Sequence, residues 1–335
     1  MTRGILERLA EGPVLGDGGY LLELEKRGYV RAGPFTPEVS ITHPEALAEV
    51  HREFLRAGAE VLQALTFYAS EEKLATVGLA GMVDELNAAA VRVARHVADE
   101  ARANGDADPL VAGTLAMTWT YDAADPASPD HVRALFDQQL DVQVAHGVDL
   151  IIGETFSWLG EALIAAERAK ATRLPVMITM CFQKDPHSYD GADPETCARR
   201  LVDAGVDIVG INCLRGPDQT LPLLAGMRAA VPDAFLAAQP VAYRTTDEVP
   251  DFTALPAFPV GLDPLQLTRA EMAEFACQAR DLGTDYIGSC CGSVAAHVRE
   301  MARALGKLPP ESRTWRVDYA KPMSAYEYYG HTDTV

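Results

Sequence analysis

Eight short apolar segments, each followed by a helix or a helix-bearing loop, constrain the fold of this chain more than any other feature. The segments do not alternate apolar and polar residues, which indicates strands buried on both faces of a parallel sheet. Eight such units over about 300 residues predict an α/β fold, a (β/α)8 TIM barrel with right-handed crossovers. An open, doubly wound sheet is the alternative, but no Gly-x-Gly-x-x-Gly turn follows the first segment. The expected strands fall in residues 13–19, 59–65, 110–114, 148–153, 175–180, 206–212, 234–238 and 285–289.

The sequence after residue 308 becomes irregular and aromatic, beyond the last regular helical pattern. We therefore expect a barrel over residues 1–308 and a C-terminal tail over 309–335 that packs on the barrel or on a neighbouring subunit. Helical patterns are expected between the strands, at residues 21–27, 43–58, 82–104, 131–145, 161–171, 196–204, 221–231, 269–282 and 294–305.

Charge and composition exclude several classes of partner. The 335 residues carry 29 basic and 48 acidic side chains, a net charge of −19, which argues against binding to nucleic acid or to an anionic membrane surface. No stretch approaches the ~18 apolar residues of a transmembrane helix, and the first residues lack the apolar core of a signal peptide. Six cysteines in so long a chain do not suggest a disulfide scaffold, so a reducing cytoplasm is the expected location.

Two adjacent cysteines, Cys290 and Cys291, end the eighth apolar segment between Gly288 and Gly292. Neighbouring cysteines bridge each other only with strain, whereas two thiolates on flexible backbone suit a thiophilic metal such as zinc. A third ligand is needed, and Cys213 ends the sixth apolar segment. A lone cysteine is more often inert core packing, but the vicinal pair with a matching third cysteine favours a metal site.

Other unusual residues also fall at the carboxyl ends of the expected strands, where barrels of this kind carry their active sites. Asp17 follows the first strand, 66–68 the second, Glu154 the fourth and Asn212 ends the sixth. Structural irregularities would be distributed over both ends of the barrel. The clustering at one end therefore predicts a functional site there.

Three thiolates on zinc leave one tetrahedral position open, which is typical of a catalytic rather than a structural site. The net charge of about −1 makes such a zinc a weak Lewis acid, poorly suited to hydrolysis. It is well suited to holding a substrate thiol as a nucleophilic thiolate. The expected chemistry is alkyl transfer to a thiol.

The segments that carry these residues resemble the homocysteine S-methyltransferase family. The resemblance rests on Gly-Asp-Gly-Gly at 16–19, Gly-Ile-Asn-Cys at 210–213 and Gly-Ser-Cys-Cys-Gly at 288–292, where Ser289 replaces the usual glycine. Within the family the chain looks most like the betaine-dependent branch. The similarity extends over about residues 4–322, and Thr-Phe-Tyr-Ala-Ser at 66–70 is specific to that branch.

The resemblance implies roles for individual residues. Zinc would be held by the three cysteines already described, and Asp17 and Glu154 would bind the ammonium group of homocysteine as catalytic-site residues. Gly18 belongs to the same substrate site, and Asn212 would lie beside the metal as a hydrogen-bond partner rather than as a lasting ligand. Helix capping or a solvated loop position is the structural alternative for the two carboxylates.

Four aromatic residues just past strand ends predict a site for the methyl donor, because a quaternary ammonium is held by aromatic faces. They are Tyr20, Phe35, Phe67 and Tyr68, and the Tyr68 hydroxyl could also reach a donor carboxylate. Three features depart from vertebrate members of the betaine branch: Phe35 replaces a tryptophan, Thr155 stands in place of an aromatic residue, and the tail is much shorter. We therefore expect a homo-oligomer smaller than a tetramer.

The predicted function is zinc-dependent transfer of a methyl group from glycine betaine to homocysteine, giving dimethylglycine and methionine. The same chemistry with a sulfonium donor, S-methylmethionine or dimethylsulfoniopropionate, is the alternative. A non-enzymatic zinc-binding or redox-sensing barrel, in which Cys290 and Cys291 bridge on oxidation, is an alternative of another class. A folate or cobalamin donor is disfavoured, because the sequence contains no second domain to present one.

Overall fold

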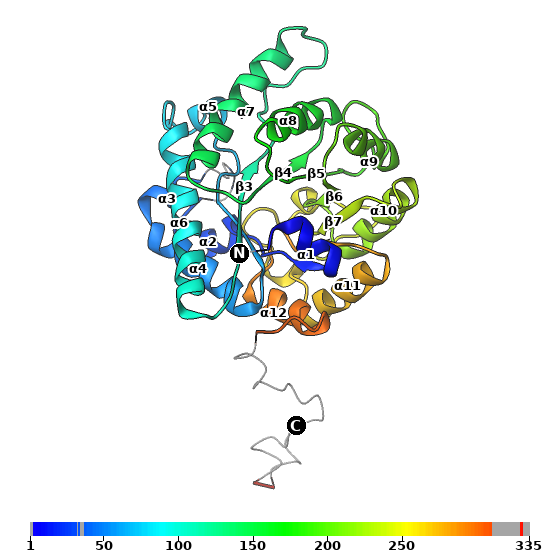
Figure 1. The fold of residues 1–335 in the computed structure, drawn as a ribbon. Coiled ribbons are helices and arrows are strands. Elements are labelled where there is room, and N and C mark those ends of the chain that lie inside the picture. Colours follow the sequence, from blue (N-terminus) through cyan, green and yellow to red (C-terminus); the bar gives the residue numbers. More distant parts are fainter. Residues whose placement is uncertain (1–2, 32, 34–36, 310–328, 331–335) are drawn as a thin grey trace.

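All eight strands lie in one parallel sheet that curls into a barrel inside a ring of helices (Figure 1). The computed structural model describes residues 3–31, 33, 37–309 and 329–330. The order of the strands is β1-β8-β7-β6-β5-β4-β3-β2, and the pairing of the first strand with the last excludes the open, doubly wound alternative. The (β/α)8 prediction is therefore confirmed. The strands are β1 (Val14–Leu15), β2 (Val61–Gln63), β3 (Leu110–Leu115), β4 (Leu150–Phe156), β5 (Val176–Met180), β6 (Ile208–Asn212), β7 (Phe235–Gln239) and β8 (Tyr286–Ile287).

The junction between β1 and β2, which we call the seam, is closed differently from the rest of the barrel. Seven neighbouring pairs of strands form ladders in the described part of the chain, with a register shift between β4 and β5, whereas β1 and β2 form none. At the seam the Glu60 backbone N–H donates to the Leu15 carbonyl at 2.8 Å, and Glu60 Oε2 accepts from the Leu15 N–H at 2.9 Å. Lys307 Nζ lies 2.7 Å from the same Glu60 oxygen. A side-chain carboxylate thus completes the barrel.

The helices that surround the sheet follow the expected alternation, with boundaries within a few residues of those predicted. Three short helices, α1, α3 and α5, and two 3-10 turns were not predicted. The helices are α1 (Ile5–Glu11), α2 (Leu21–Lys26), α3 (Val39–Thr42), α4 (Pro44–Ala57), α5 (Glu71–Ala75), α6 (Val83–Asn104), α7 (Ser128–Ala145), α8 (Leu159–Ala171), α9 (Pro194–Asp203), α10 (Pro217–Ala230), α11 (Arg269–Asp281) and α12 (Ala295–Ala304); the 3-10 turns are η1 (Phe252–Ala254) and η2 (Asp263–Leu265).

Local sequence sets where several helices begin and end. The Thr268 side chain accepts a hydrogen bond from the Glu271 N–H while the Glu271 carboxylate bonds back, a capping box that starts α11. Asp193 caps α9 by accepting from the Thr196 N–H. Gly58 ends α4 in the left-handed conformation, with φ of 110°. These signals place the helices so that each returns the chain to the next strand.

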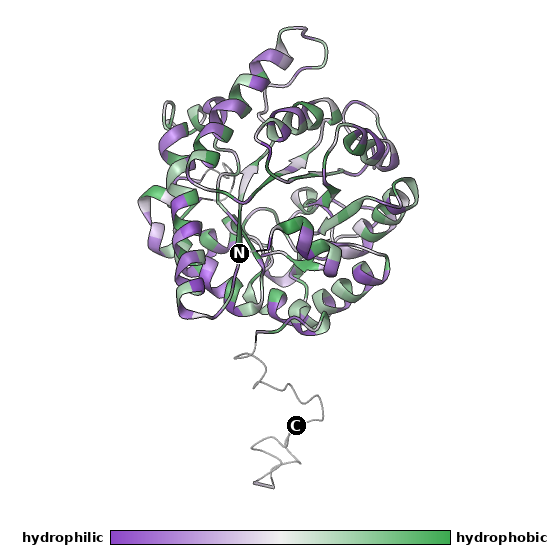
Figure 2. Ribbon diagram, in the orientation of Figure 1, coloured by the Kyte–Doolittle hydropathy of each residue, from purple (hydrophilic) through white to green (hydrophobic). Residues whose placement is uncertain are grey.

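The apolar core has two parts. The larger part lies between the strands and the inner faces of the helices, and Figure 2 shows hydrophobic and hydrophilic stretches alternating along those helices. The smaller part fills the amino-terminal end of the barrel, where Ile5 and Leu9 of α1 pack against Val14, Val61 and Leu110. Because α1 covers this end, the chain leaves the carboxyl ends of the strands for ligands.

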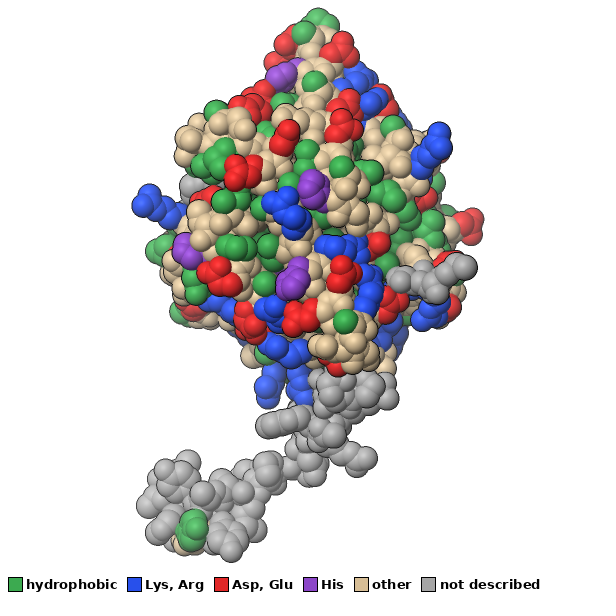
Figure 3. All heavy atoms as spheres, turned by 60° about the vertical axis from the view of Figure 1, so that its left-hand side comes forward, with side chains coloured by type: hydrophobic (Ala, Val, Ile, Leu, Met, Phe, Trp, Pro, Cys, Tyr) green, Lys and Arg blue, Asp and Glu red, His purple; other side chains and the backbone are tan. Residues whose placement is uncertain are grey.

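The outer surface mixes charges of both signs. Figure 3 shows basic and acidic side chains interspersed over the face that carries α4 and α6, and Arg52 of α4 pairs with Glu100 of α6 at 2.9 Å. None of the described helices is long and apolar enough to cross a membrane. The tail predicted for 309–335 lies outside the described residues, apart from Pro309, Tyr329 and Gly330.

Candidate metal centre and substrate pocket

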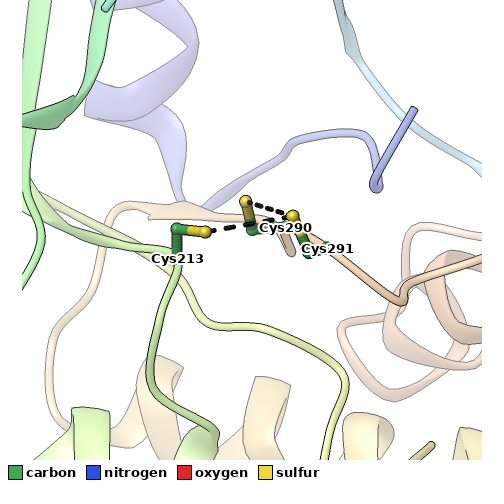
Figure 4. Close-up of side chains that lie close together, drawn as sticks. All are labelled: Cys213, Cys290 and Cys291. Carbon is green, nitrogen blue, oxygen red and sulfur yellow. Dashed lines mark hydrogen bonds between the residues drawn. The ribbon is translucent and has the colours of Figure 1, made fainter. Parts of the chain in front are cut away.

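Three cysteines converge at the carboxyl-terminal end of the barrel, as the sequence predicted. Cys213 directly follows β6, and Cys290 and Cys291 follow β8 by three and four residues. The Cys291 sulfur lies 3.9 Å from the sulfurs of both Cys213 and Cys290, and all three sulfurs lie within 4.8 Å of one another (Figure 4). Among the described residues this is the group whose side chains could hold a metal ion.

Backbone hydrogen bonds fix the two cysteine segments against the loop that follows β7. The Cys213 N–H donates to the Gln239 carbonyl at 2.9 Å, and the Cys290 N–H donates to the Pro240 carbonyl at 2.8 Å. Gly19 packs so closely on this segment that a Cβ there would lie 2.7 Å from the Cys290 carbonyl oxygen. The glycines of the first strand end therefore allow the β1 loop to approach the cysteine pair.

The thiols themselves require a cation to become ligands. The contact with the Cys213 thiol raises the pKa of Cys290 well above its usual range, and burial adds to this increase. Without a positive charge the three sulfurs therefore stay protonated. Three soft donors at these separations fit a thiophilic metal ion, which lowers thiol pKa values by coordination.

Asp17 lies two residues after β1 and is fully buried. Its Oδ2 accepts hydrogen bonds from the Tyr20 hydroxyl at 2.5 Å and from the Gln63 backbone N–H at 2.7 Å. Its Oδ1 is buried and has no hydrogen-bond partner among the described residues. Burial raises the pKa of Asp17 to about 7, although the two hydrogen bonds act in the opposite direction. A buried carboxylate oxygen without a partner suits a cationic ligand.

Glu154 belongs to β4 itself, which extends three residues further than the predicted strand. Burial, and to a lesser extent the negative charge of Asp17, raises the pKa of Glu154 to about 8. Asn212 donates from Nδ2 to Glu154 Oε2 at 3.1 Å, and its Oδ1 accepts from the Thr155 N–H at 2.7 Å and from the Thr179 hydroxyl at 2.9 Å. The Asn212 amide is thus used within the protein, where it positions Glu154 and Thr155.

The aromatic residues predicted for a donor site have different surroundings. Phe67 and Tyr68 stack on each other, with ring centroids 3.9 Å apart, and Phe67 lines the pocket beside the cysteines. The Tyr20 hydroxyl is occupied by Asp17 and by His51 Nδ1 at 3.0 Å, so this side chain anchors the carboxylate as well as lining the pocket. Phe35 lies outside the described residues.

One cavity of about 70 Å³ lies between the three cysteines, Tyr20 and Phe67. Gly18 and Glu154 line it together with the cysteines, and so do two residues that sequence reasoning missed, Gln63 and Gln239. Gln63 Nε2 and Gln239 Oε1 are buried without hydrogen-bond partners in the described part of the chain. Both glutamines end a strand, the signal that identified the other site residues. The cavity therefore presents one unpaired donor and one unpaired acceptor to a polar ligand.

The fold and the site define a barrel protein whose strand ends bring together three thiols that could hold a metal ion and two carboxyl groups with raised pKa values. The sequence model of the homocysteine S-methyltransferase family matches residues 14–305. The chain belongs to the homocysteine S-methyltransferase family, which confirms the resemblance found in the sequence and the prediction of a methyltransferase.

Relatives of known name support this assignment. Betaine–homocysteine S-methyltransferase 1 of Mus musculus is 45% identical over 326 residues, which cover 92% of this chain and 77% of the relative. The S-methylmethionine–homocysteine S-methyltransferase of Pongo abelii is 41% identical over 320 residues, 92% of this chain and 84% of the relative. The metallated homocysteine methyltransferase MmuM of Escherichia coli superimposes with a TM-score of 0.72 at 22% identity, over 90% of this chain and 99% of that chain, and thus shares the fold.

Proposed function

We propose that this protein transfers a methyl group from glycine betaine to the thiol of homocysteine, giving dimethylglycine and methionine, with zinc held by its three clustered cysteines. The observation that carries the proposal is the convergence of three thiols and the Glu154 carboxyl group on one cavity, with the buried Asp17 carboxyl group bonded to Tyr20 and Gln63, which line it. The 45% identity with the mouse betaine–homocysteine enzyme supports the choice of donor and acceptor.

The spacing of the sulfurs supports zinc as the metal. Sulfurs arranged tetrahedrally at about 2.3 Å from zinc lie about 3.8 Å apart. Two of the sulfur–sulfur distances here are 3.9 Å. Bound zinc would supply an open fourth position that holds the homocysteine sulfur as a nucleophilic thiolate.

We assign the ammonium group of homocysteine to Asp17 and Glu154. Because their pKa values are about 7 and about 8, the two carboxyl groups are partly protonated at neutral pH when no ligand is bound. An ammonium group lets both carboxylates ionise in a buried place, because it supplies the compensating charge. Gln63 Nε2, which has no hydrogen-bond partner, is then available to donate to the carboxylate group of homocysteine.

The transfer itself is an in-line displacement at the methyl carbon. The homocysteine sulfur forms the new carbon–sulfur bond, the carbon–nitrogen bond breaks, and the nitrogen leaves with the electron pair as a neutral tertiary amine. No general base is needed in this step, since the thiol proton has already departed. The protein contributes mainly by aligning the two substrates and excluding water.

A sulfonium donor is the second candidate. Aromatic faces bind nitrogen and sulfur oniums alike, so Phe67 and Tyr68 do not distinguish the two classes. The relative named for S-methylmethionine, at 41% identity, favours keeping this candidate.

The test is a panel of donors offered to the zinc-loaded protein with homocysteine, with methionine as the measured product. We expect the highest kcat/KM for glycine betaine. A sulfonium that exceeds betaine by ten-fold or more, about 1.4 kcal/mol, would contradict the betaine assignment and leave the thiol acceptor intact. No methionine from any donor would contradict the proposed function as a whole.

We also propose a reducing cytoplasmic location, because the ligand cysteines and the acceptor are useful only as thiols. All six cysteines are free. The assembly predicted from the sequence, a homo-oligomer smaller than a tetramer, can be checked by light scattering.

A further inference from the structure

Lys73 has an unusual position for a lysine on the pocket side of a barrel. It lies in α5, and its Nζ is 4.8 Å from the ring centroid of Tyr68 and 5.6 Å from that of Trp119. Its nearest acidic neighbours in sequence are engaged elsewhere: Glu71 accepts from the Gly81 N–H, and Glu72 pairs with His131. Among the described residues Lys73 has no carboxylate partner, so the aromatic pair is what its ammonium contacts.

The aromatic pair belongs to the same rim as the metal site. Tyr68 is 8% exposed and stacks on Phe67, which lines the cavity with the cysteines. Trp119 is 59% exposed and meets Tyr68 edge to face at 5.9 Å. Large exposed tryptophans on a site rim suit a ligand, since the protein gains nothing from leaving them in water.

Lys73 occupies the face of Tyr68 that a donor cation needs. The Phe67 ring, 3.9 Å away, leaves no room for a second group on its side of Tyr68. The Lys73 ammonium lies over the Tyr68 ring, 4.8 Å from its centroid, in the kind of position where a trimethylammonium group would form its cation–π contact. A cation entering the site must displace the lysine and then meets a like charge nearby.

A donor that carries its own carboxylate changes this balance. When its onium group takes the aromatic face, the carboxylate gives the displaced ammonium a charged partner in a partly desolvated place. A cation without a carboxylate provides no charged partner for the displaced Lys73 ammonium, and the repulsion between the two positive charges remains. The same side chain thus favours one class of ligand and penalises the other.

We propose that Lys73 determines donor specificity: its ammonium leaves the Tyr68–Trp119 pair for the carboxylate of a zwitterionic onium, so that glycine betaine is accepted and bare oniums are rejected. The inference rests on the proposed function, since it concerns the methyl donor of that reaction.

The test compares glycine betaine with choline, which has the same trimethylammonium head and no carboxylate. In the zinc-loaded enzyme with homocysteine, one measures the KM for betaine and the inhibition constant of choline against betaine. For Lys73→Met we expect the betaine KM to rise about ten-fold, the choline constant to stay or fall, and the homocysteine KM to stay unchanged. Lys73→Arg keeps the charge and should restore wild-type discrimination.

Lys184→Met is the matched control. Lys184 is an exposed lysine just past β5, so the variant removes one positive charge from the same end of the barrel away from the aromatic pair. Its ratio of choline constant to betaine KM should equal that of the wild type.

Two results would overturn the inference. The first is an unchanged ratio of choline constant to betaine KM in Lys73→Met, whether both constants stay the same or rise equally. The second is unfolding of both Lys73→Met and Lys73→Gln, which would make the lysine structural. If the wild type makes no methionine from betaine, the result contradicts the proposed function itself, and the inference about Lys73 falls with it. A wild type that is active, with a Lys73→Met variant that discriminates normally, refutes only the role of Lys73.

Discussion

Replacing Asp17 by asparagine tests the acceptor site with the smallest change of shape. Both groups that contact Asp17 Oδ2, the Tyr20 hydroxyl and the Gln63 N–H, are donors. The amide oxygen of Asp17→Asn must therefore take the Oδ2 position, because the amide nitrogen has no acceptor there. The NH2 group then occupies the place of Oδ1, the oxygen left without a partner. In the variant, an N–H hydrogen-bond donor would face the ammonium group of homocysteine, in place of the carboxylate oxygen that accepts from it in the wild type.

The expected magnitude follows from this geometry. The variant loses a hydrogen bond between charged groups, which contributes about 1.5–3 kcal/mol. At about 1.4 kcal/mol per factor of ten, the KM for homocysteine should rise by roughly 10- to 150-fold. The fold should persist, since both internal hydrogen bonds of Asp17 are kept.

The assay is steady-state formation of methionine with homocysteine and betaine varied in turn, and zinc content checked in each preparation. Glu154→Gln is the companion variant, because Asn212 Nδ2 likewise fixes which side its amide presents. The betaine KM is the internal control and should change by less than about two-fold. A homocysteine KM within two-fold of the wild type, or a loss confined to betaine, would refute the assignment of the carboxylates.

Further outcomes are expected at the metal, with pH and at the donor side. Cys213→Ser should lower zinc below one equivalent per chain by elemental analysis, whereas Cys277→Ser, a change on α11, should keep it; full zinc in Cys213→Ser would remove this residue from the site. The homocysteine KM should rise as the pH falls from about 8 to about 6, because Asp17 and Glu154, with pKa values of about 7 and about 8, become neutral over that range. A KM that is flat with pH would contradict their ionised role. Tyr68→Ala should raise the betaine KM about 2- to 30-fold, the 0.5–2 kcal/mol of one cation–π contact, and leave the homocysteine KM alone. An equal effect on both substrates would indicate that the pocket has collapsed.

The barrel could be predicted because its buried parallel strands leave a clear pattern of short apolar segments. The helices that were missed leave no such pattern. α3 and α5 span four and five residues, too few for a periodic signal. The two core residues of α1, Ile5 and Leu9, gain their meaning from strand residues far along the chain, such as Leu110.

The site divides in the same way. Cysteines and acids at strand ends are rare enough to attract notice, and the three sulfurs do converge. Gln63, Gln239 and Lys73 are ordinary polar residues in a sequence, and only the fold shows that their polar groups face a pocket or an aromatic pair. Likewise, the path of the chain after β1 decides that the Tyr20 hydroxyl bonds to Asp17.

The seam between β1 and β2 joins two parts of the proposed site. Asp17 follows β1, whereas Phe67 and Tyr68 follow β2. Across this junction the carboxylates of Glu60 and Asp17 receive backbone N–H groups in place of a ladder of main-chain bonds. A substitution that shortens Asp17 to alanine therefore removes one bond of the barrel closure together with a carboxylate of the proposed site.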